Sequence, residues 1–375
     1  MNSCRSWPTP WRRSTRFVTG RGALQDAPTP RRQIQTIQYA RAIVACLIVF
    51  WHTGGWRAEL AHRQYYLYAF MMISGFVLSL PTSRRESGPL KYIVSKMARI
   101  SPVYWLITIV IAIVICLIPN QRAHISASEL ILSLAFVPHY NSAHLMYPIL
   151  IPGWYLTYDV VLVLLLGALC KVGHDTRFWL VNGALAGLVV LGVAFRPSDP
   201  IGYRLTDQIL SAFIVGAMIQ RVLSGRTMPR ALALLLVVLG LALCGLGWSA
   251  PTAVSWPLLV SGLPVFIAMT GVIGLDRPND RPLPWLRWIG DASMSIYLWH
   301  ELGIAGAGMV LRRIGIAAPN FTMGLETMGG FALGAVMYPL LERPITRYLV
   351  GKVNAAFDGS KTVAGAAAPV AMLPQ

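Results

Sequence analysis

The sequence is poor in charged residues, and acidic residues are the scarcest of them. Asp and Glu account for 15 of the 375 residues, and the four charged types together make up 13%. Soluble domains carry about 25% charged residues. With 55% hydrophobic residues and a mean hydropathy of +0.56, the composition excludes an ordinary soluble domain and is typical of an integral membrane protein.

Cysteines are few, and nucleotide-binding motifs are absent from the sequence. The five cysteines are too scattered to match a zinc site or a disulfide framework, so we expect no metal centre. The chain has no internal repeat, no Walker loop and no GxGxxG between a strand and a helix, which argues against an ATP-driven pump. We expect no permanently bound cofactor.

Long apolar stretches are what the chain does contain. A bilayer-spanning helix needs about 20 mostly apolar residues. Ten stretches qualify, at approximately residues 37–56, 64–81, 100–119, 150–170, 178–195, 205–222, 231–249, 254–275, 284–306 and 324–346. Residues 126–137 are too short to span and predict an interfacial or re-entrant helix. The predicted fold is an all-α integral membrane protein, a bundle of about ten transmembrane helices.

The net charge of +17 would suggest nucleic acid as the partner of a soluble protein, but its distribution indicates topology instead. With the N-terminus in the cytoplasm, 25 of the 32 Lys and Arg residues fall on the inner side of the membrane. Cytoplasmic loops carry such an excess. We therefore expect both termini in the cytoplasm, a multi-pass protein of the bacterial inner membrane, and no nucleic acid.

Three regions follow from the composition. Residues 1–36 hold seven Arg and four Pro without an apolar run, which predicts a disordered basic cytoplasmic tail attracted to anionic lipids. A translation start after residue 33 explains them equally well. Residues 37–350 are the membrane domain, and residues 351–375, rich in Ala, Gly and Pro, are predicted to be a flexible cytoplasmic tail.

Arg41 and His52 stand eleven positions apart in the first apolar stretch. On an α-helix they project from the same face, about 16 Å apart along the axis. Ionisable side chains inside a bilayer are costly unless they function or are paired. A cation near one surface and an imidazole at depth suit an anionic ligand whose reactive end reaches inward. In the alternative interpretation, the Arg41 side chain reaches to the lipid headgroups and His52 is a core histidine whose hydrogen bonds are made within the bundle.

Further polar groups lie in or next to the apolar stretches. Lys96 and Arg99 share a helix face before the third stretch and either grip phosphates or only set the topology. Asp159, inside the fourth stretch, needs an oppositely charged or hydrogen-bonding partner or a water-filled cavity. Ser293, Tyr297 and His300 form one polar stripe, which fits substrate contact and interhelical hydrogen bonding equally well. Trp154 and Tyr158, close to Asp159, and Glu342, at the end of the tenth stretch, complete the candidate site.

Six blocks in this order resemble acyltransferase family 3, a family of integral-membrane O-acyltransferases, and above all its exopolysaccharide subgroup. The resemblance covers residues 35–350. The blocks are Arg41 with His52, Ile73-Ser74-Gly75-Phe76, Lys96 and Arg99 ahead of Pro102-Val103-Tyr104-Trp105, Gly153–Leu156, Gly290–His300, and Tyr338–Pro344. Two positions depart from the family pattern, because Lys96 replaces an Arg and Asp159 replaces a Glu. The second departure bears on the identity of the acceptor first, and on the type of reaction only after that.

The resemblance implies transfer of an acyl group, acetyl in the first place, from cytoplasmic acyl-CoA to a hydroxyl of an exopolysaccharide or another surface glycan. Arg41, Lys96 and Arg99 would hold the phosphates of coenzyme A. His52 would act as general base or carry the acyl group itself. The other candidate residues would contact the acceptor or support the site.

Two other functions fit part of the pattern. A carrier or flippase for a lipid-linked saccharide would also place charges within the membrane, but it would show inverted repeats that the chain lacks. A catalytically degenerate family member acting as a partner in polysaccharide export would explain the departures at Lys96 and Asp159. The sugar, its hydroxyl position, the choice between acetyl and succinyl, and the oligomeric state do not follow from the sequence.

Overall fold

The computed structural model describes residues 35–54, 65–80, 88–117, 125–223, 226–249, 261–277, 280–316 and 318–366, and every regular element within them is helical. The all-α prediction is confirmed for these residues; residues 1–34 lie outside them. The helices are α1 (Gln35–His52), α2 (Tyr65–Leu78), α3 (Pro89–Leu117), α4 (Ala127–Leu134), α5 (Gly153–Ala168), α6 (His174–Phe195), α7 (Pro200–Leu205), α8 (Leu210–Leu223), α9 (Arg230–Ser249), α10 (Leu263–Gly274), α11 (Pro284–Asp291), α12 (Ser293–Arg313), α13 (Pro319–Met337) and α14 (Arg343–Ala366).

Each of the ten apolar stretches overlaps at least one helix, and the short helix predicted at residues 126–137 is α4. By length and apolar composition together, two helices of the described part of the chain, α3 and α6, could cross a membrane. The helices α2, α5 and α10 are apolar but shorter than 18 residues. The ten-span arrangement and the cytoplasmic termini therefore stay predictions.

The structure breaks the predicted span at residues 284–306 into two helices. Ala292 ends α11 and begins α12, with φ −81° and ψ −3°. Just before this break, Gly290 packs so tightly on α1 that a Cβ there would overlap the backbone of Gln38. No proline stands at this junction of α11 and α12. The break therefore coincides with tight tertiary packing and not with a helix-breaking residue.

The predicted span at residues 324–346 is not one regular α-helix either. One π-helical turn, Tyr338–Glu342, connects α13 to α14. Such turns are rare and occur often at functional sites. The helix α14 then continues to Ala366, so the predicted flexible tail at residues 351–375 is helical over its first part. Residues 367–375 lie outside the described part of the chain.

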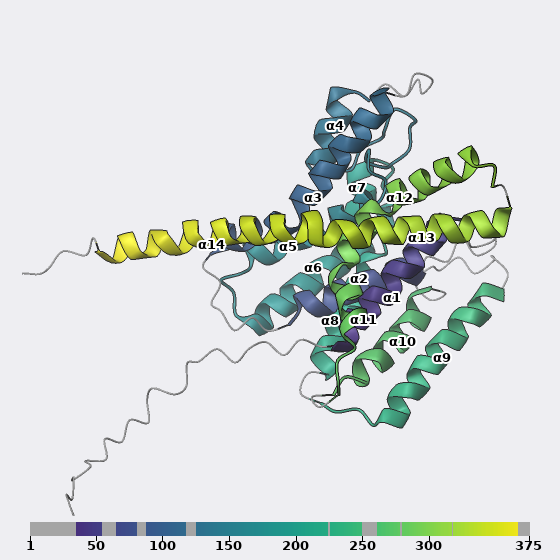
Figure 1. The fold of residues 1–375 in the computed structure, drawn as a ribbon. Coiled ribbons are helices and arrows are strands. Elements are labelled where there is room, and N and C mark those ends of the chain that lie inside the picture. The colour runs from purple at the N-terminus through teal and green to yellow at the C-terminus, as the bar shows by residue number, and fades with distance from the viewer. Residues whose placement is uncertain are drawn as a thin grey trace, which may run out of the picture. The chain divides into compact units, whose positions relative to one another are not determined.

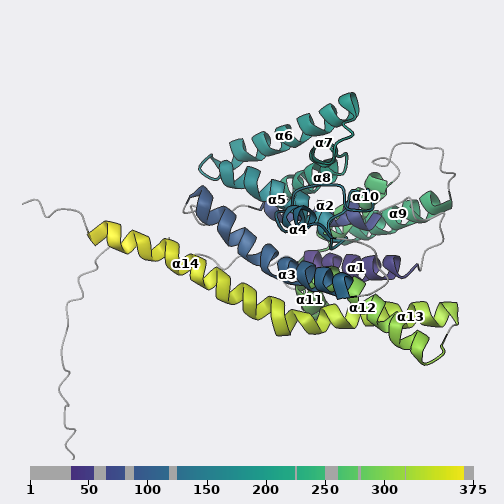
Figure 2. The ribbon, with the colours of Figure 1, turned by 90° about the horizontal axis from the view of Figure 1, so that it is seen from above.

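Helix α1 is surrounded by other helices. It packs against α2, α10, α11, α12 and α13, elements from both halves of the chain. Figure 1 shows α1 among these helices, and in Figure 2 α2 and α10 lie on one side of it and α11 and α12 on the other. Its residues Ile48 and Val49 are completely buried. The helix that carries Arg41 and His52 is therefore fixed by contacts on several sides.

Small residues allow α2 and α8 to pack closely. A Cβ added to Gly75 of α2 would overlap the backbone of Phe213, and one added to Gly216 of α8 would overlap the backbone of Met72. Close backbone approach at glycines is characteristic of helix association in membranes, where packing replaces the hydrophobic effect as the driving force. This crossing holds the Ser74 segment against the bundle.

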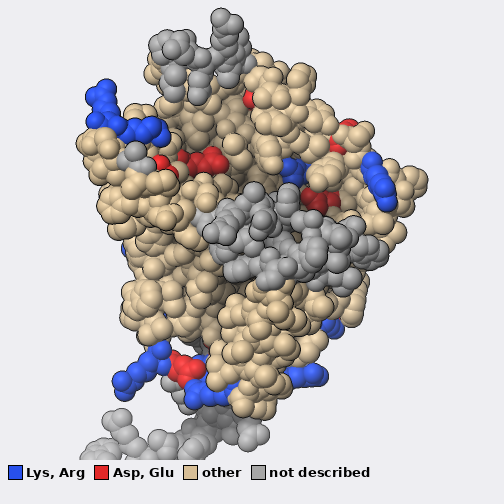
Figure 3. All heavy atoms as spheres, turned by 90° about the vertical axis from the view of Figure 1, so that its right-hand side faces the viewer, with Lys and Arg blue, Asp and Glu red and all other residues tan. Residues whose placement is uncertain are grey.

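Large apolar side chains are exposed along several helices. Ile113 of α3, Val190 of α6 and Val238 of α9 have 53%, 65% and 63% of their surface exposed. Soluble proteins rarely expose extended apolar patches. On the face drawn in Figure 3, charged side chains gather in an upper and a lower zone, and the visible surface between them is mostly uncharged. Both features suit helices surrounded by lipid.

Candidate active site

His52 and His300 lie in direct contact, although they belong to different helices. The ring of His52, at the end of α1, stands edge-on to the ring of His300 in α12, with the centroids 4.6 Å apart and an interplanar angle of 65°. His300 is completely buried, whereas His52 is exposed. The sequence places His300 only in a polar stripe; the structure adds its contact with the predicted catalytic histidine.

Each histidine has one nitrogen fixed by a backbone carbonyl. The Nδ1 of His52 lies 2.8 Å from the carbonyl oxygen of Ile48, and the Nδ1 of His300 lies 2.7 Å from that of Tyr297. A carbonyl only accepts, so Nδ1 carries the hydrogen and the neutral rings keep their lone pairs on Nε2. The Nε2 of His300 has no hydrogen-bond partner among the described residues. Both rings therefore offer a free base at Nε2.

Glu301 joins the two histidines. Ligand atoms of His52, His300 and Glu301 all lie within 4.8 Å of one another, so this group, found among the residues that the structure describes, could hold a metal ion. Nitrogen ligands at about 2.1 Å from a tetrahedral zinc ion lie about 3.4 Å apart, so the group would have to contract around one. Without a metal, the same groups can accept, hold and pass on a proton.

Arg41 is surrounded by acidic groups. The carboxylates of Glu342, Asp291 and Asp159 act electrostatically on its guanidinium, with Tyr155 also close. These groups come from the π-helical turn, the end of α11, and α5. Arg41 is half-buried, and these neighbouring charges offset part of its own charge within the protein. The Arg41 of the first motif and the Glu342 of the last therefore interact electrostatically.

The structure also resolves why Asp159 is tolerated in an apolar helix. Its carboxyl is hydrogen-bonded to Ser74 of α2, and the charges of Arg41 in α1 and Lys96 in α3 act on it electrostatically. The ammonium of Lys96 also lies 5.6 Å from the centroid of the Tyr92 ring. Arg99, one turn further along α3, is exposed. Lys96 thus belongs to the interior charged cluster, whereas Arg99 faces outward from the bundle.

The polar stripe of α12 is entirely buried. Ser293 and His300 have no exposed surface, and Tyr297 has 4% exposed. The hydroxyl of Tyr297 donates to the carbonyl oxygen of Pro152 at 2.5 Å, a bond between α12 and the residue before α5. The Ser293 hydroxyl has no partner among the described residues. At Tyr297, therefore, interhelical hydrogen bonding is present.

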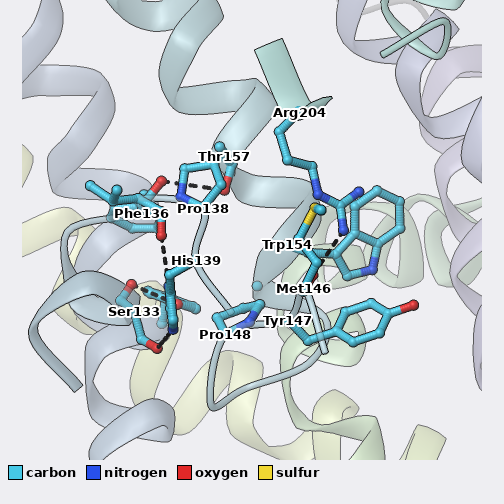
Figure 4. Close-up of a pocket in the computed structure, with 13 residues that line it drawn as sticks. Ser133, Phe136, Pro138, His139, Met146, Tyr147, Pro148, Trp154, Thr157 and Arg204 are labelled. Atoms are coloured by element: carbon cyan, nitrogen blue, oxygen red, sulfur yellow. Dashed lines mark hydrogen bonds between the residues drawn. The ribbon is translucent and has the colours of Figure 1, made fainter. Parts of the chain in front are cut away.

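Trp154 and Tyr158 belong to a separate cluster built around Arg204. The guanidinium of Arg204 lies 4.6 Å from the Trp154 ring centroid and 3.3 Å from the Tyr158 hydroxyl (Figure 4 shows Arg204 above Trp154). The Tyr158 hydroxyl donates to Asp207 at 2.6 Å. Tyr158 is 1% exposed, so its hydroxyl is committed to this network.

A continuous run of aromatic rings connects the Trp154 cluster to the two histidines. The centroids of Trp154 and Tyr155 are 6.3 Å apart, those of Tyr155 and Tyr297 are 6.0 Å apart, and those of Tyr297 and His300 are 6.1 Å apart. The Tyr155 hydroxyl also lies 3.3 Å from the Ser74 hydroxyl, and Tyr155 interacts electrostatically with Arg41. Tyr155 and Tyr297 thus stand between the histidines, the Arg41 cluster and the Trp154 cluster.

Comparison with known proteins assigns this arrangement to a family. The acyltransferase domain of acyltransferase family 3 matches residues 34–341. The chain belongs to acyltransferase family 3. It is also 31% identical over 286 residues to the exopolysaccharide production protein ExoZ of Rhizobium meliloti (strain 1021), a match that covers 74% of this chain and 88% of ExoZ. No solved structure matches the chain.

The family assignment confirms the resemblance drawn from the six sequence blocks. Acyltransferase family 3 is generally membrane-embedded, and a family member transfers acyl groups other than aminoacyl groups. The matched region includes the Arg41–His52 pair and the Gly290–His300 block, and ends one residue before Glu342. The chain is therefore an acyltransferase by family, with the site residues themselves still predictions.

Several residues of these clusters were not among the sequence candidates. Glu301 and Asp291 could have been found by the argument used for Asp159, because each is an acidic residue in an apolar stretch. Arg204 and Asp207 are opposite charges three positions apart, a spacing that predicts a pair on a helix. The contact of His52 with His300 carries no local sequence signal.

Proposed function

We propose that this protein is a membrane O-acyltransferase that moves an acyl group, acetyl in the first place, from cytoplasmic acyl-CoA to a hydroxyl of an exopolysaccharide or another cell-surface glycan. The observation that carries the proposal is the pair of free Nε2 atoms on His52 and His300, in a chain of this family. It supports an unprotonated base on the helix that also carries the Arg41 cation.

In the proposed reaction His52 is the general base. Its Nε2 takes the proton of the acceptor hydroxyl while that oxygen attacks the carbonyl carbon of the thioester. The carbon–sulfur bond then breaks, and the coenzyme A thiolate leaves and recovers the proton from His52. The products are the glycan ester and the free thiol of coenzyme A. An alternative order, in which His52 first carries the acyl group and then passes it on, gives the same products.

Within this proposal the cations hold the donor unequally. Arg99 is exposed and has a planar guanidinium that binds a phosphate through two parallel hydrogen bonds, so we assign it the main contact with coenzyme A. Lys96 contributes a point charge. Arg41 is already compensated by Glu342, Asp291 and Asp159, so its contribution requires a phosphate to compete with these carboxylates.

The membrane arrangement is part of the proposal. Ten spans with both tails in the cytoplasm follow from the apolar stretches and from the 25-to-7 partition of basic residues. The exposed apolar side chains of α3, α6 and α9 and the uncharged zone in Figure 3 support contact with lipid. Coenzyme A would then approach from the cytoplasm, and the glycan from the opposite side.

Mass spectrometry of the surface glycan tests the proposal. A deletion strain should lose one class of acyl ester, and the wild-type gene should restore it. The purified protein in lipid nanodiscs should transfer radiolabelled acetyl from acetyl-CoA to the deacylated glycan of the same strain. Unchanged acylation in the deletion strain would show that the function lies elsewhere, for instance in glycan export without covalent chemistry.

A further inference from the structure

A large cavity lies beside the Trp154 cluster. Its volume is about 990 Å³, at the upper end of the range for small-molecule sites, so it has room for a ligand larger than one sugar ring. Met146 and Tyr147, before α5, and Trp154, in α5, line one part of it. Residues from the end of α6 to the start of α8 line another part.

The lining combines aromatic rings with polar side chains. Trp154, Tyr147 and Tyr203 supply rings, while Gln208 and Asp207 supply hydrogen-bonding groups. The charge of Asp207 raises the pKa of the Tyr203 hydroxyl, so this group stays protonated and is able to donate. Aromatic faces pack against the C–H faces of a sugar ring, and amides, hydroxyls and carboxylates bind its hydroxyl groups. This is the lining that a saccharide requires.

The wall around Trp154 is held rigidly before any ligand binds. Arg204 stacks on the Trp154 ring and donates to the carbonyl oxygen of Met146 at 3.1 Å, as Figure 4 shows. Its NH1 lies 4.0 Å from Asp207, and its side chain is 11% exposed. Because these contacts are made within the protein, binding does not have to order them. Such preorganisation raises affinity.

The lining segments share one side of the expected topology. In the ten-span arrangement, Tyr68 at the start of α2, Trp154 at the start of α5 and the end of α6 all stand at the outer ends of their spans, and Ser261 stands in the outer half of its span. These segments are distant in the sequence, and the structure brings them to one cavity. A glycan outside the cytoplasmic membrane would therefore meet this cavity first.

A run of aromatic rings links the cavity to the reaction centre. Trp154 lines it, and the run of rings through Tyr155 and Tyr297 leads from Trp154 to His300 and His52. We propose that this cavity is the acceptor site, where a saccharide of more than one sugar ring stacks on Trp154, Tyr147 and Tyr203 and presents one hydroxyl toward His52. The inference rests on the proposed function.

Kinetics of the purified protein in lipid nanodiscs test the inference. The probe is an oligosaccharide released from the strain's own surface polysaccharide and deacylated with alkali. Tyr203→Ala and Gln208→Ala should each raise the acceptor KM about fivefold or more, with the acetyl-CoA KM unchanged. Tyr348→Ala is the matched control, because Tyr348 is an exposed tyrosine of α14 that does not line the cavity.

The possible outcomes separate the two proposals. Wild-type transfer with an unchanged acceptor KM in Tyr203→Ala and Gln208→Ala would overturn the acceptor site and leave the acyltransferase intact. No transfer by the wild-type protein to the strain's own oligosaccharide, in a preparation that binds acetyl-CoA, would overturn the proposed function instead. An equal rise of the acceptor KM in Tyr348→Ala would show a general disturbance and also contradict the site.

Discussion

The imidazole of His300 stands edge-on against the imidazole of His52, with 4.6 Å between the ring centroids. In each ring Nδ1 donates to a carbonyl of its own helix, so the two Nε2 atoms are the free bases of the site. One ring is exposed and the other is fully buried. From this asymmetry we expect His52 to contact the substrate and His300 to support it.

Replacing the two histidines should therefore have unequal effects. His52→Ala should accumulate normally and lower acyl transfer at least about 100-fold, because the general base is lost. His300→Ala should lower it only about 3- to 30-fold, the equivalent of about 0.6–2 kcal/mol for one intramembrane contact. Acyl groups on the glycan are the readout, with protein levels checked by blotting.

His174→Ala serves as a control for these variants, since His174 lies at the start of α6, away from the two rings. Robust modification of the glycan by His52→Ala would contradict the mechanism, even with the family assignment intact. A loss in His300→Ala as large as in His52→Ala would mean that both rings take part in proton transfer.

Chelation distinguishes a base mechanism from a metal mechanism at the same residues. If His52 acts through a free Nε2, an excess of 1,10-phenanthroline should leave the rate of acyl transfer unchanged. Loss of activity that zinc restores, together with about one equivalent of metal in the purified protein, would show instead that His52, His300 and Glu301 form a metal site.

Much of the helical framework, but little of the site, could be predicted from the sequence. The lengths of the apolar runs identify the helices, because a helix needs about 20 mostly apolar residues to cross a bilayer. The break at Ala292 carries no local signal such as a proline, and the close packing of Gly290 on Gln38 beside it is a tertiary feature. The contact of His52 with His300 joins helices from opposite ends of the chain, and spacing within one helix says nothing about it.

The cations of α3 should differ in their effect on donor binding. Arg99→Ala should raise the KM for acetyl-CoA more than Lys96→Ala does, because only the guanidinium of Arg99 binds a phosphate through two hydrogen bonds. Lys96→Arg restores the residue usual in the family and should be tolerated. The measurement is acetyl-CoA titration at two salt concentrations, since a phosphate contact at the exposed Arg99 weakens with salt. Equal donor affinity in wild type and Arg99→Ala would reduce these residues to determinants of topology.

Packing at Gly290 should contribute to the stability of the protein. Gly290→Ala would force a methyl group into the backbone of Gln38 and separate α11 from α1. Overpacking of this kind costs about 1–3 kcal/mol. Fluorescence-detected gel filtration of detergent extracts should show less monodisperse protein and a lower melting temperature. Gly187→Ala in α6 is the control, because a Cβ at Gly187 meets nothing within 4 Å. Equal behaviour of the two variants would contradict the close packing.

Cysteine labelling tests the orientation on which the roles of both substrates depend. Tyr140 follows α4 and is 49% exposed, in the segment that the charge distribution places outside the cytoplasmic membrane. In a background with the five native cysteines replaced, Tyr140→Cys should react in intact spheroplasts with a reagent that does not cross membranes. A cysteine at Lys352 of α14 should react only after the membrane is opened.

The opposite labelling pattern would change the roles assigned to the two ends of the bundle as well as the topology. The cavity next to Trp154 lies toward the same end of the chain's spans as Tyr140, and Arg99 lies toward the opposite end. With residue 140 in the cytoplasm, coenzyme A would meet the aromatic cavity and the glycan would meet the cations of α3. The donor and acceptor assignments would then have to be exchanged.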